Sequence, residues 1–203
     1  MSLSDFIAAQ DLQELGGKLR DAVNNAARFY DAHSEDEDAL TGAFAQEIIR
    51  ELQGVKLPSG DEVSVRHRKY RGRGQNADEI RLGADGFFEV EVKEGNTVKT
   101  TKSLPYQAKN DWKKTDKDLV KQCKKMHDSF GEGASIVVNY TKNGYEGYKT
   151  EDVIESGGKE SESGSTSLGD MLGSQFLNCK IGKEGLNTTG YKLNSTIITI
   201  QKL

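Results

Sequence analysis

Two stretches near the N-terminus have the apolar spacing that is typical of helices. Residues 4–32 are rich in Ala, Leu and Gln, which predicts a helix with an interruption at Gly16 and Gly17. A second helix is expected to begin near Ser34, because apolar residues then recur at every fourth position, at Leu40, Phe44 and Ile48.

From Leu82 onward the hydrophobic period changes from that of a helix to two, which indicates a half-buried strand. Its apolar positions are Phe88, Val90 and Val92, and its polar positions, expected on the solvent face, are Glu89, Glu91 and Lys93. The sequence EGN at 94–96 is a hairpin signal, so a return strand is predicted over 98–109.

The rest of the chain adds a helix over 116–130 and a nearly continuous apolar run at 134–140 that is typical of an interior strand. We therefore predict a single α/β domain, with a central mixed sheet of four to five strands flanked by helices. Its parts are N-terminal helices, a core, a flexible excursion rich in Gly, Ser and Glu, and a C-terminal helix and strand, at residues 1–55, 56–154, 155–167 and 168–203.

Composition is consistent with a folded, water-soluble domain. The 203 residues are 34% hydrophobic and 30% charged, and no run approaches the roughly 18 apolar residues of a membrane helix. The first residues lack the pattern of a secretory signal. Cys123 and Cys179 form neither a disulfide framework nor a zinc pattern. We expect a cytoplasmic protein that does not contact membranes.

The net charge of −4 hides two local clusters of basic residues. A basic face on an acidic chain still attracts a polyanion, although charge runs of this kind equally occur on ordinary solvated surfaces. The candidates for contacts to nucleic-acid phosphates are Arg66, Arg68, Lys69, Arg71, Arg73, Lys113 and Lys114.

Asp85, in the GAD at 83–85, precedes two polar pairs that each end in a lysine. Glu91 and Lys93 form the first pair, but about 20 Å of straight strand separates Asp85 from Glu91. These two carboxylates therefore share no metal ion unless the strand is broken.

Gln107 and Lys109 form the second pair, on the return strand. A hairpin centred near residue 95 places residue 106 opposite Asp85, and the period of two puts Gln107 and Lys109 on one face. The geometry predicts a site made of Asp85, Gln107 and Lys109.

GAD, a hairpin and then QAK at 107–109 resemble the PD-(D/E)XK superfamily of restriction-endonuclease-like nucleases, in the branches with Q-x-K. DLVKQCKKM and SIVVNYT are similar to the helix and strand that follow the catalytic hairpin in bacterial restriction and phage-defence nucleases, and EDALTG resembles their opening helix. The resemblance covers roughly residues 34–150.

This resemblance implies a Mg²⁺-dependent nuclease, in which Mn²⁺ is a substitute. Asp85 and Glu37 would be carboxylate ligands, Gln107 and the carbonyl of Ala108 further ligands, and Lys109 would activate the attacking water. The neutral amide of Gln107 departs from the acidic signature, which leaves metal affinity and activity in question.

Glu37 has two readings. It completes a capping box with Ser34, or it ligates the metal. On a helix it lies about 20° from Phe44 and Ile48, and a carboxylate on the apolar face needs a partner.

The predicted function is hydrolysis of DNA phosphodiester bonds by an endonuclease, in restriction or antiphage defence, with RNA left open as the substrate. The alternative is a non-catalytic nucleic-acid-binding or assembly subunit that keeps the nuclease fold, which the Gln107 change favours. We expect protein partners as well: a second copy of the chain, or a partner subunit of a defence complex, since so short a chain has little room for a separate sensor.

Overall fold

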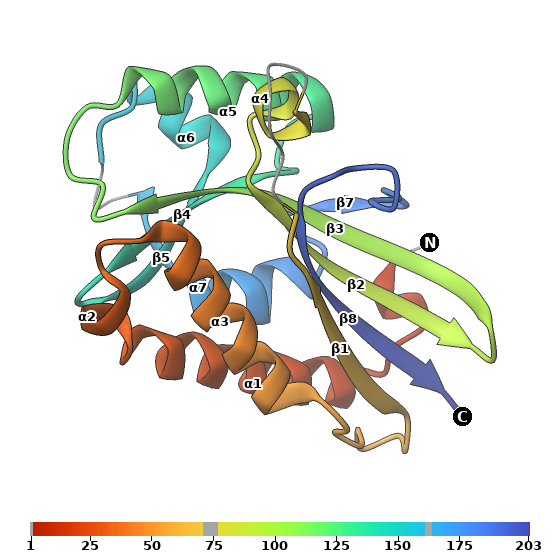
Figure 1. The fold of residues 1–203 in the computed structure, drawn as a ribbon. Helices are drawn as coiled ribbons and strands as arrows, with labels where there is room; N and C mark the ends of the chain where they lie inside the picture. The colour runs from red at the N-terminus through yellow and green to blue at the C-terminus, as the bar shows by residue number, and fades with distance from the viewer. Residues whose placement is uncertain (1, 71–76, 161–163) are drawn as a thin grey trace.

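The computed structural model describes residues 2–70, 77–160 and 164–203, and in this part of the chain the strands form one mixed, eight-stranded sheet (Figure 1). The prediction of an α/β fold with helices flanking a mixed sheet is confirmed. The predicted count of four to five strands is wrong, because residues 62–68 also form a strand and two strands of two residues join the sheet.

The strands are β1 (Glu62–Arg68), β2 (Gly86–Glu94), β3 (Thr97–Asn110), β4 (Ile136–Thr141), β5 (Gly144–Lys149), β6 (Thr166–Ser167), β7 (Lys183–Glu184) and β8 (Asn194–Lys202). The α-helices are α1 (Ala9–Ala27), α2 (Tyr30–His33), α3 (Glu37–Leu52), α4 (Asp78–Leu82), α5 (Lys117–Phe130), α6 (Thr150–Glu155) and α7 (Leu168–Asp170). A 3₁₀ turn, η1 (Leu3–Asp5), precedes α1, and a π-helical turn, η3 (Met171–Phe176), follows α7.

The strand order is β1-β8-β2-β3-β4-β5-β6, with β7 paired to β3. The C-terminal strand β8 is therefore an interior strand, parallel to β2 and antiparallel to β1. Its residues Ile197, Ile198 and Ile200 are buried on both faces, as expected for a strand inside a covered sheet.

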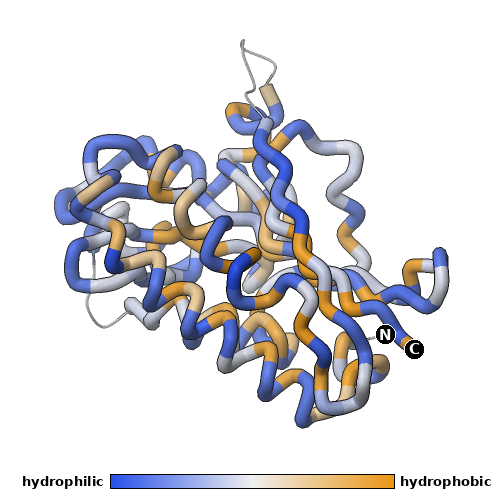
Figure 2. Tube along the Cα trace, turned by 60° about the horizontal axis from the view of Figure 1, so that its bottom comes forward, coloured by the Kyte–Doolittle hydropathy of each residue, from blue (hydrophilic) through white to orange (hydrophobic). Residues whose placement is uncertain are grey.

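Helices cover the sheet on both faces (Figure 1). One hydrophobic cluster joins α1, α3 and the α7–η3 segment to the sheet, and a second joins α4, α5 and α6 to its other face. Apolar positions recur along strands and helices with hydrophilic positions between them (Figure 2). None of the described helices is long and apolar enough to cross a membrane.

Helix α1 runs unbroken through Gly16 and Gly17, so the predicted interruption is wrong. A Cβ atom on Gly16 would lie 2.3 Å from the carbonyl oxygen of Gly173 in η3. The glycine therefore allows close packing of two backbones inside a continuous helix.

The hairpin of β2 and β3 forms as predicted, but its polar face is not exposed to solvent. Glu89 and Glu91 are each only 5% exposed, which contradicts the expectation of an amphipathic strand. The chain returns across this face of the hairpin between residues 183 and 189, where Thr188 donates a hydrogen bond to Glu89. Burial here depends on a segment about one hundred residues away in the sequence.

Candidate functional site

Asp85 lies between α4 and β2, in a conformation that Gly83 makes possible. Gly83 ends α4 with a positive φ of 74°, and a Cβ atom there would lie 2.4 Å from the carbonyl oxygen of Gln122. Only glycine allows this approach between the turn and α5. The amide of Asp85 then donates to the carbonyl of Tyr106 at 2.8 Å, which fixes Asp85 beside β3.

The carboxylate of Asp85 contacts the predicted partner strand. Its Oδ2 accepts hydrogen bonds from Nε2 of Gln107 at 2.5 Å and from the amide of Ala108 at 2.7 Å. The predicted proximity of Asp85 and Gln107 is therefore present. Pairing runs from Gly86 opposite Tyr106, one residue from the predicted register, because the strands shift at a bulge after Val92.

Lys109 lies on the same face of β3 as Gln107, but its ammonium group pairs with Asp116 and not with Asp85. Its Nζ lies 3.5 Å from Oδ2 of Asp116, whose Oδ1 caps the N-terminus of α5. Both side chains are partly exposed. The cap residue of α5 thus holds the lysine at the edge of the site.

Glu37 is the first residue of α3, and the predicted capping box with Ser34 is wrong. The N-cap is Asp36, whose carboxylate accepts from the amides of Asp38 and Ala39. The carbonyl of Ser34 instead accepts from the side-chain amide of Asn110 at the end of β3. This contact ties the start of α3 to the end of β3 and leaves the Glu37 side chain available to the site.

The pKa values of Asp85 and Glu37 are both raised. Burial raises the pKa of Asp85 to about 7; the Ala108 amide opposes this increase, while Glu37 and Glu79 add to it. Burial likewise raises the pKa of Glu37 to about 7, and Lys109 acts in the opposite direction. A cation placed among these groups would favour their ionised forms.

Glu79 is a site residue that the sequence analysis did not single out. It lies on the short helix α4, is exposed, and raises the pKa values of both Glu37 and Asp85. A cavity of about 410 Å³ is lined by the three acids Glu37, Glu79 and Asp85, together with Ala108 and Lys192. The pattern ADEI at 77–80, an acid-rich start followed by an apolar residue, was the available signal of a helix.

The carboxylate oxygens of Asp85, Glu37 and Glu79 are hard ligands, which suit a cation such as Mg²⁺. However, no three acidic, His or Cys side chains converge on one point in the described residues. Gln107 is 3% exposed, and its buried Oε1 has no hydrogen-bond partner in the described structure. Its Nε2, not its oxygen, faces Asp85. An exchange of the amide's two ends would turn an oxygen ligand toward a cation at Asp85.

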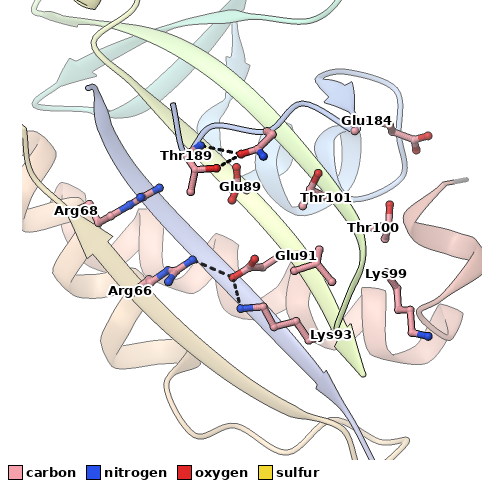
Figure 3. Close-up of a pocket in the computed structure, with 13 residues that line it drawn as sticks. Arg66, Arg68, Glu89, Glu91, Lys93, Lys99, Thr100, Thr101, Glu184 and Thr189 are labelled. Atoms are coloured by element: carbon pink, nitrogen blue, oxygen red, sulfur yellow. Dashed lines mark hydrogen bonds and ion pairs between the residues drawn. The ribbon is translucent and has the colours of Figure 1, made fainter. Parts of the chain in front are cut away.

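The predicted phosphate-binding residues do not form one surface. Arg66 and Arg68 lie on β1 and line a different cavity (Figure 3), whereas Lys69 pairs with Asp38 at 3.6 Å beside Glu37.

The other basic candidates lie elsewhere. Lys113 pairs with Asp111 at 2.7 Å, and both Lys113 and Lys114 line a third hollow over residues 111–118. Arg71 and Arg73 lie outside the described residues. Of the candidates that the structure describes, only Lys69 is thus placed by contact beside the Asp85 cavity.

Comparisons of the chain with models of protein families, with curated proteins and with solved structures found no match. The resemblance to PD-(D/E)XK nucleases therefore stays a prediction, and the function is argued from the site.

Proposed function

We propose that the protein is a metal-dependent endonuclease that hydrolyses phosphodiester bonds in DNA. The observation that carries this proposal is the meeting of Asp85 with Gln107 and Ala108 at one end of the hairpin, in a cavity shared with Glu37. A bound Mg²⁺ would supply charge neutralisation at the phosphoryl group and a more acidic water.

Each residue of the site would have a separate role. Asp85 and Glu37 would hold the ion, with the carbonyl of Ala108 as a third oxygen. The amides of Gln107 and Ala108 fix Oδ2 of Asp85, so that its orientation is set before any ligand arrives. Lys109, held by Asp116, would offset charge on the phosphate and orient the water.

The rim of the cavity suits a phosphate chain. Lys192 and Tyr70 line it, and Lys69 is held nearby only by an exposed ion pair. Such a pair contributes about 0–1 kcal/mol and exchanges readily for a phosphate. We extend the proposal to restriction or antiphage defence on the basis of the sequence resemblance alone.

Cleavage of plasmid and linear DNA with Mg²⁺ or Mn²⁺ tests the proposal. Asp85→Asn and Lys109→Ala are each expected to lose at least about 100-fold in rate. Asp31→Asn and Lys142→Ala are the matched controls, since they remove the same groups from an exposed pair outside the cavity. Loss in the control variants, or full activity in the first pair, would overturn the assignment.

A second candidate is a non-catalytic subunit that binds nucleic acid. The observation that favours it is the contact of Gln107 Nε2 with Asp85, where an acidic residue would contribute charge to a metal site. Salt-sensitive DNA binding without cleavage, and without heat of Mg²⁺ binding in calorimetry, would select this candidate.

A further inference from the structure

A second cavity, of about 680 Å³, lies on the sheet face to which Glu89 and Glu91 point (Figure 3). Arg66 and Arg68 enter it from β1, and residues 184–189 border it on the other side. Its lining shares no residue with the Asp85 cavity. Its volume is in the range of small-molecule sites.

Glu91 on its floor is neutralised by the protein itself. Its Oε1 accepts from Arg66 at 3.2 Å and from Thr199 at 2.7 Å, and Lys93 lies 3.1 Å away. Two cations and a hydroxyl group thus hold one carboxylate oxygen. This half of the cavity is complete without a ligand.

Glu89 lacks such a partner. Its Oε2 accepts from the hydroxyl groups of Ser103 at 3.0 Å and Thr188 at 2.6 Å, and no cation of the described residues forms an ion pair with it. Both of these hydrogen bonds reach Oε2, and Glu89 lines the cavity, so Oε1 is the oxygen on which a ligand could donate. A carboxylate that is 5% exposed and has no counter-charge is costly unless a ligand donates to it.

Arg68 stands to Glu89 as Arg66 stands to Glu91. On β8, which lies between β1 and β2, Arg66 pairs with Ile197 and Arg68 pairs with Ser195. Glu91 pairs with Thr199 and Glu89 with Ile197, so each arginine is displaced by two β8 residues from the acid on its far side. Figure 3 shows both side chains extending over β8 toward β2. Yet Arg68 makes no ion pair in the described structure, and its buried Nε has no hydrogen-bond acceptor.

We propose that this cavity binds a ribose phosphate, with the phosphate on Arg68 and the 2′-hydroxyl on Glu89. A guanidinium matches phosphate oxygens, and a carboxylate accepts from a ribose hydroxyl. No aromatic side chain lines the cavity in the described structure, so recognition falls on the sugar phosphate and not on a stacked base. Lys99, in an exposed pair with Glu94, adds a second cation at the rim.

Calorimetric titration with AMP, 2′-deoxy-AMP and inorganic phosphate tests this site, in EDTA so that no metal occupies the Asp85 cavity. AMP is expected to bind about tenfold more tightly than 2′-deoxy-AMP, the effect of one hydrogen bond to a charged group. Glu89→Gln and Arg68→Gln should each weaken AMP about tenfold, and Asp85→Asn should leave it unchanged. Arg68 is partly exposed, so its variant is expected to fold even if Glu89→Gln does not.

Octamers of riboadenylate and deoxyadenylate distinguish the source of the ribose phosphate. Binding of AMP alone assigns a free nucleotide, and preferential binding of the ribo-octamer assigns an RNA strand. Equal binding of ribo and deoxy forms, an unaffected Arg68→Gln variant, or no saturable binding of any probe would overturn the proposal. The two cavities share no lining residue, so the absence of a ribose-phosphate site would not count against the proposed nuclease activity at Asp85.

Discussion

Two carboxylates, Asp85 just before β2 and Glu91 toward its far end, are held by different kinds of partner. Asp85, before β2, receives hydrogen bonds from two neutral amide groups, and burial raises its pKa to about 7. Glu91, near the other end, is held by Arg66 and Lys93. Within the described residues, no cation contacts Asp85, whereas Glu91 already has two, so the proposed metal ion would act at the Asp85 end.

The largest expected effect comes from removing the second acid at the Asp85 end. Glu37→Gln should lower Mg²⁺ affinity and cleavage about 100-fold, because one of two ionisable oxygen ligands is lost. The measurement is the cleavage rate as a function of Mg²⁺ concentration. Glu35→Gln, at an exposed acid outside the cavity lining, should change the rate less than threefold; equal losses would mean that general charge, not ligation, matters.

At the other end of β2 the expected effect is on stability. Glu91→Ala should lower the free energy of unfolding by about 2 kcal/mol, because the hydroxyl of Thr199 and two cations lose their acceptor. Urea denaturation measures this change. The control is Glu94→Ala, which removes an exposed ion pair and should lower the free energy of unfolding by less than about 0.5 kcal/mol. If Glu91→Ala cost no more than Glu94→Ala, the ion pairs of Glu91 would not stabilise the fold.

The Asp85 end should also show a pH-dependent stability without metal. The folded pKa of about 7 exceeds the ordinary aspartate pKa of 3.8, so the folded protein binds the proton more tightly. Its contribution is complete below about pH 4 and is lost as pH rises toward 7. Asp85→Asn should therefore melt about 3 °C above wild type at pH 8 in EDTA, with no gain at pH 4. A gain that is independent of pH would contradict the titration of Asp85.

The smallest expected effect is that of Glu79. Glu79→Gln should weaken Mg²⁺ binding about threefold, since an exposed charge acts on the cavity only through a screened field. The loss should shrink at 0.5 M salt. Glu132→Gln, an exposed acid elsewhere, is the control, and a loss as large as that of Glu37→Gln would make Glu79 a ligand.

Local pattern was sufficient to predict the hairpin end of the site. A period of two and a turn at 94–96 bring Asp85 to Gln107 and place Lys109 on the same face, whatever the rest of the chain does. The bulge after Val92 shifted the register by one residue. The predicted contact survived because this shift sets Gln107, in place of Tyr106, opposite Asp85, one step beyond the pair of Gly86 and Tyr106.

The sequence by itself therefore determined which residues share a face of a strand, because backbone periodicity is local. Only the tertiary structure decided what covers that face. Asn110 draws α3 and Glu37 to the site, and the return of residues 183–189 with β8 buries Glu89 and Glu91. These contacts join segments 76 to 108 residues apart, and no periodicity within either segment encodes the other.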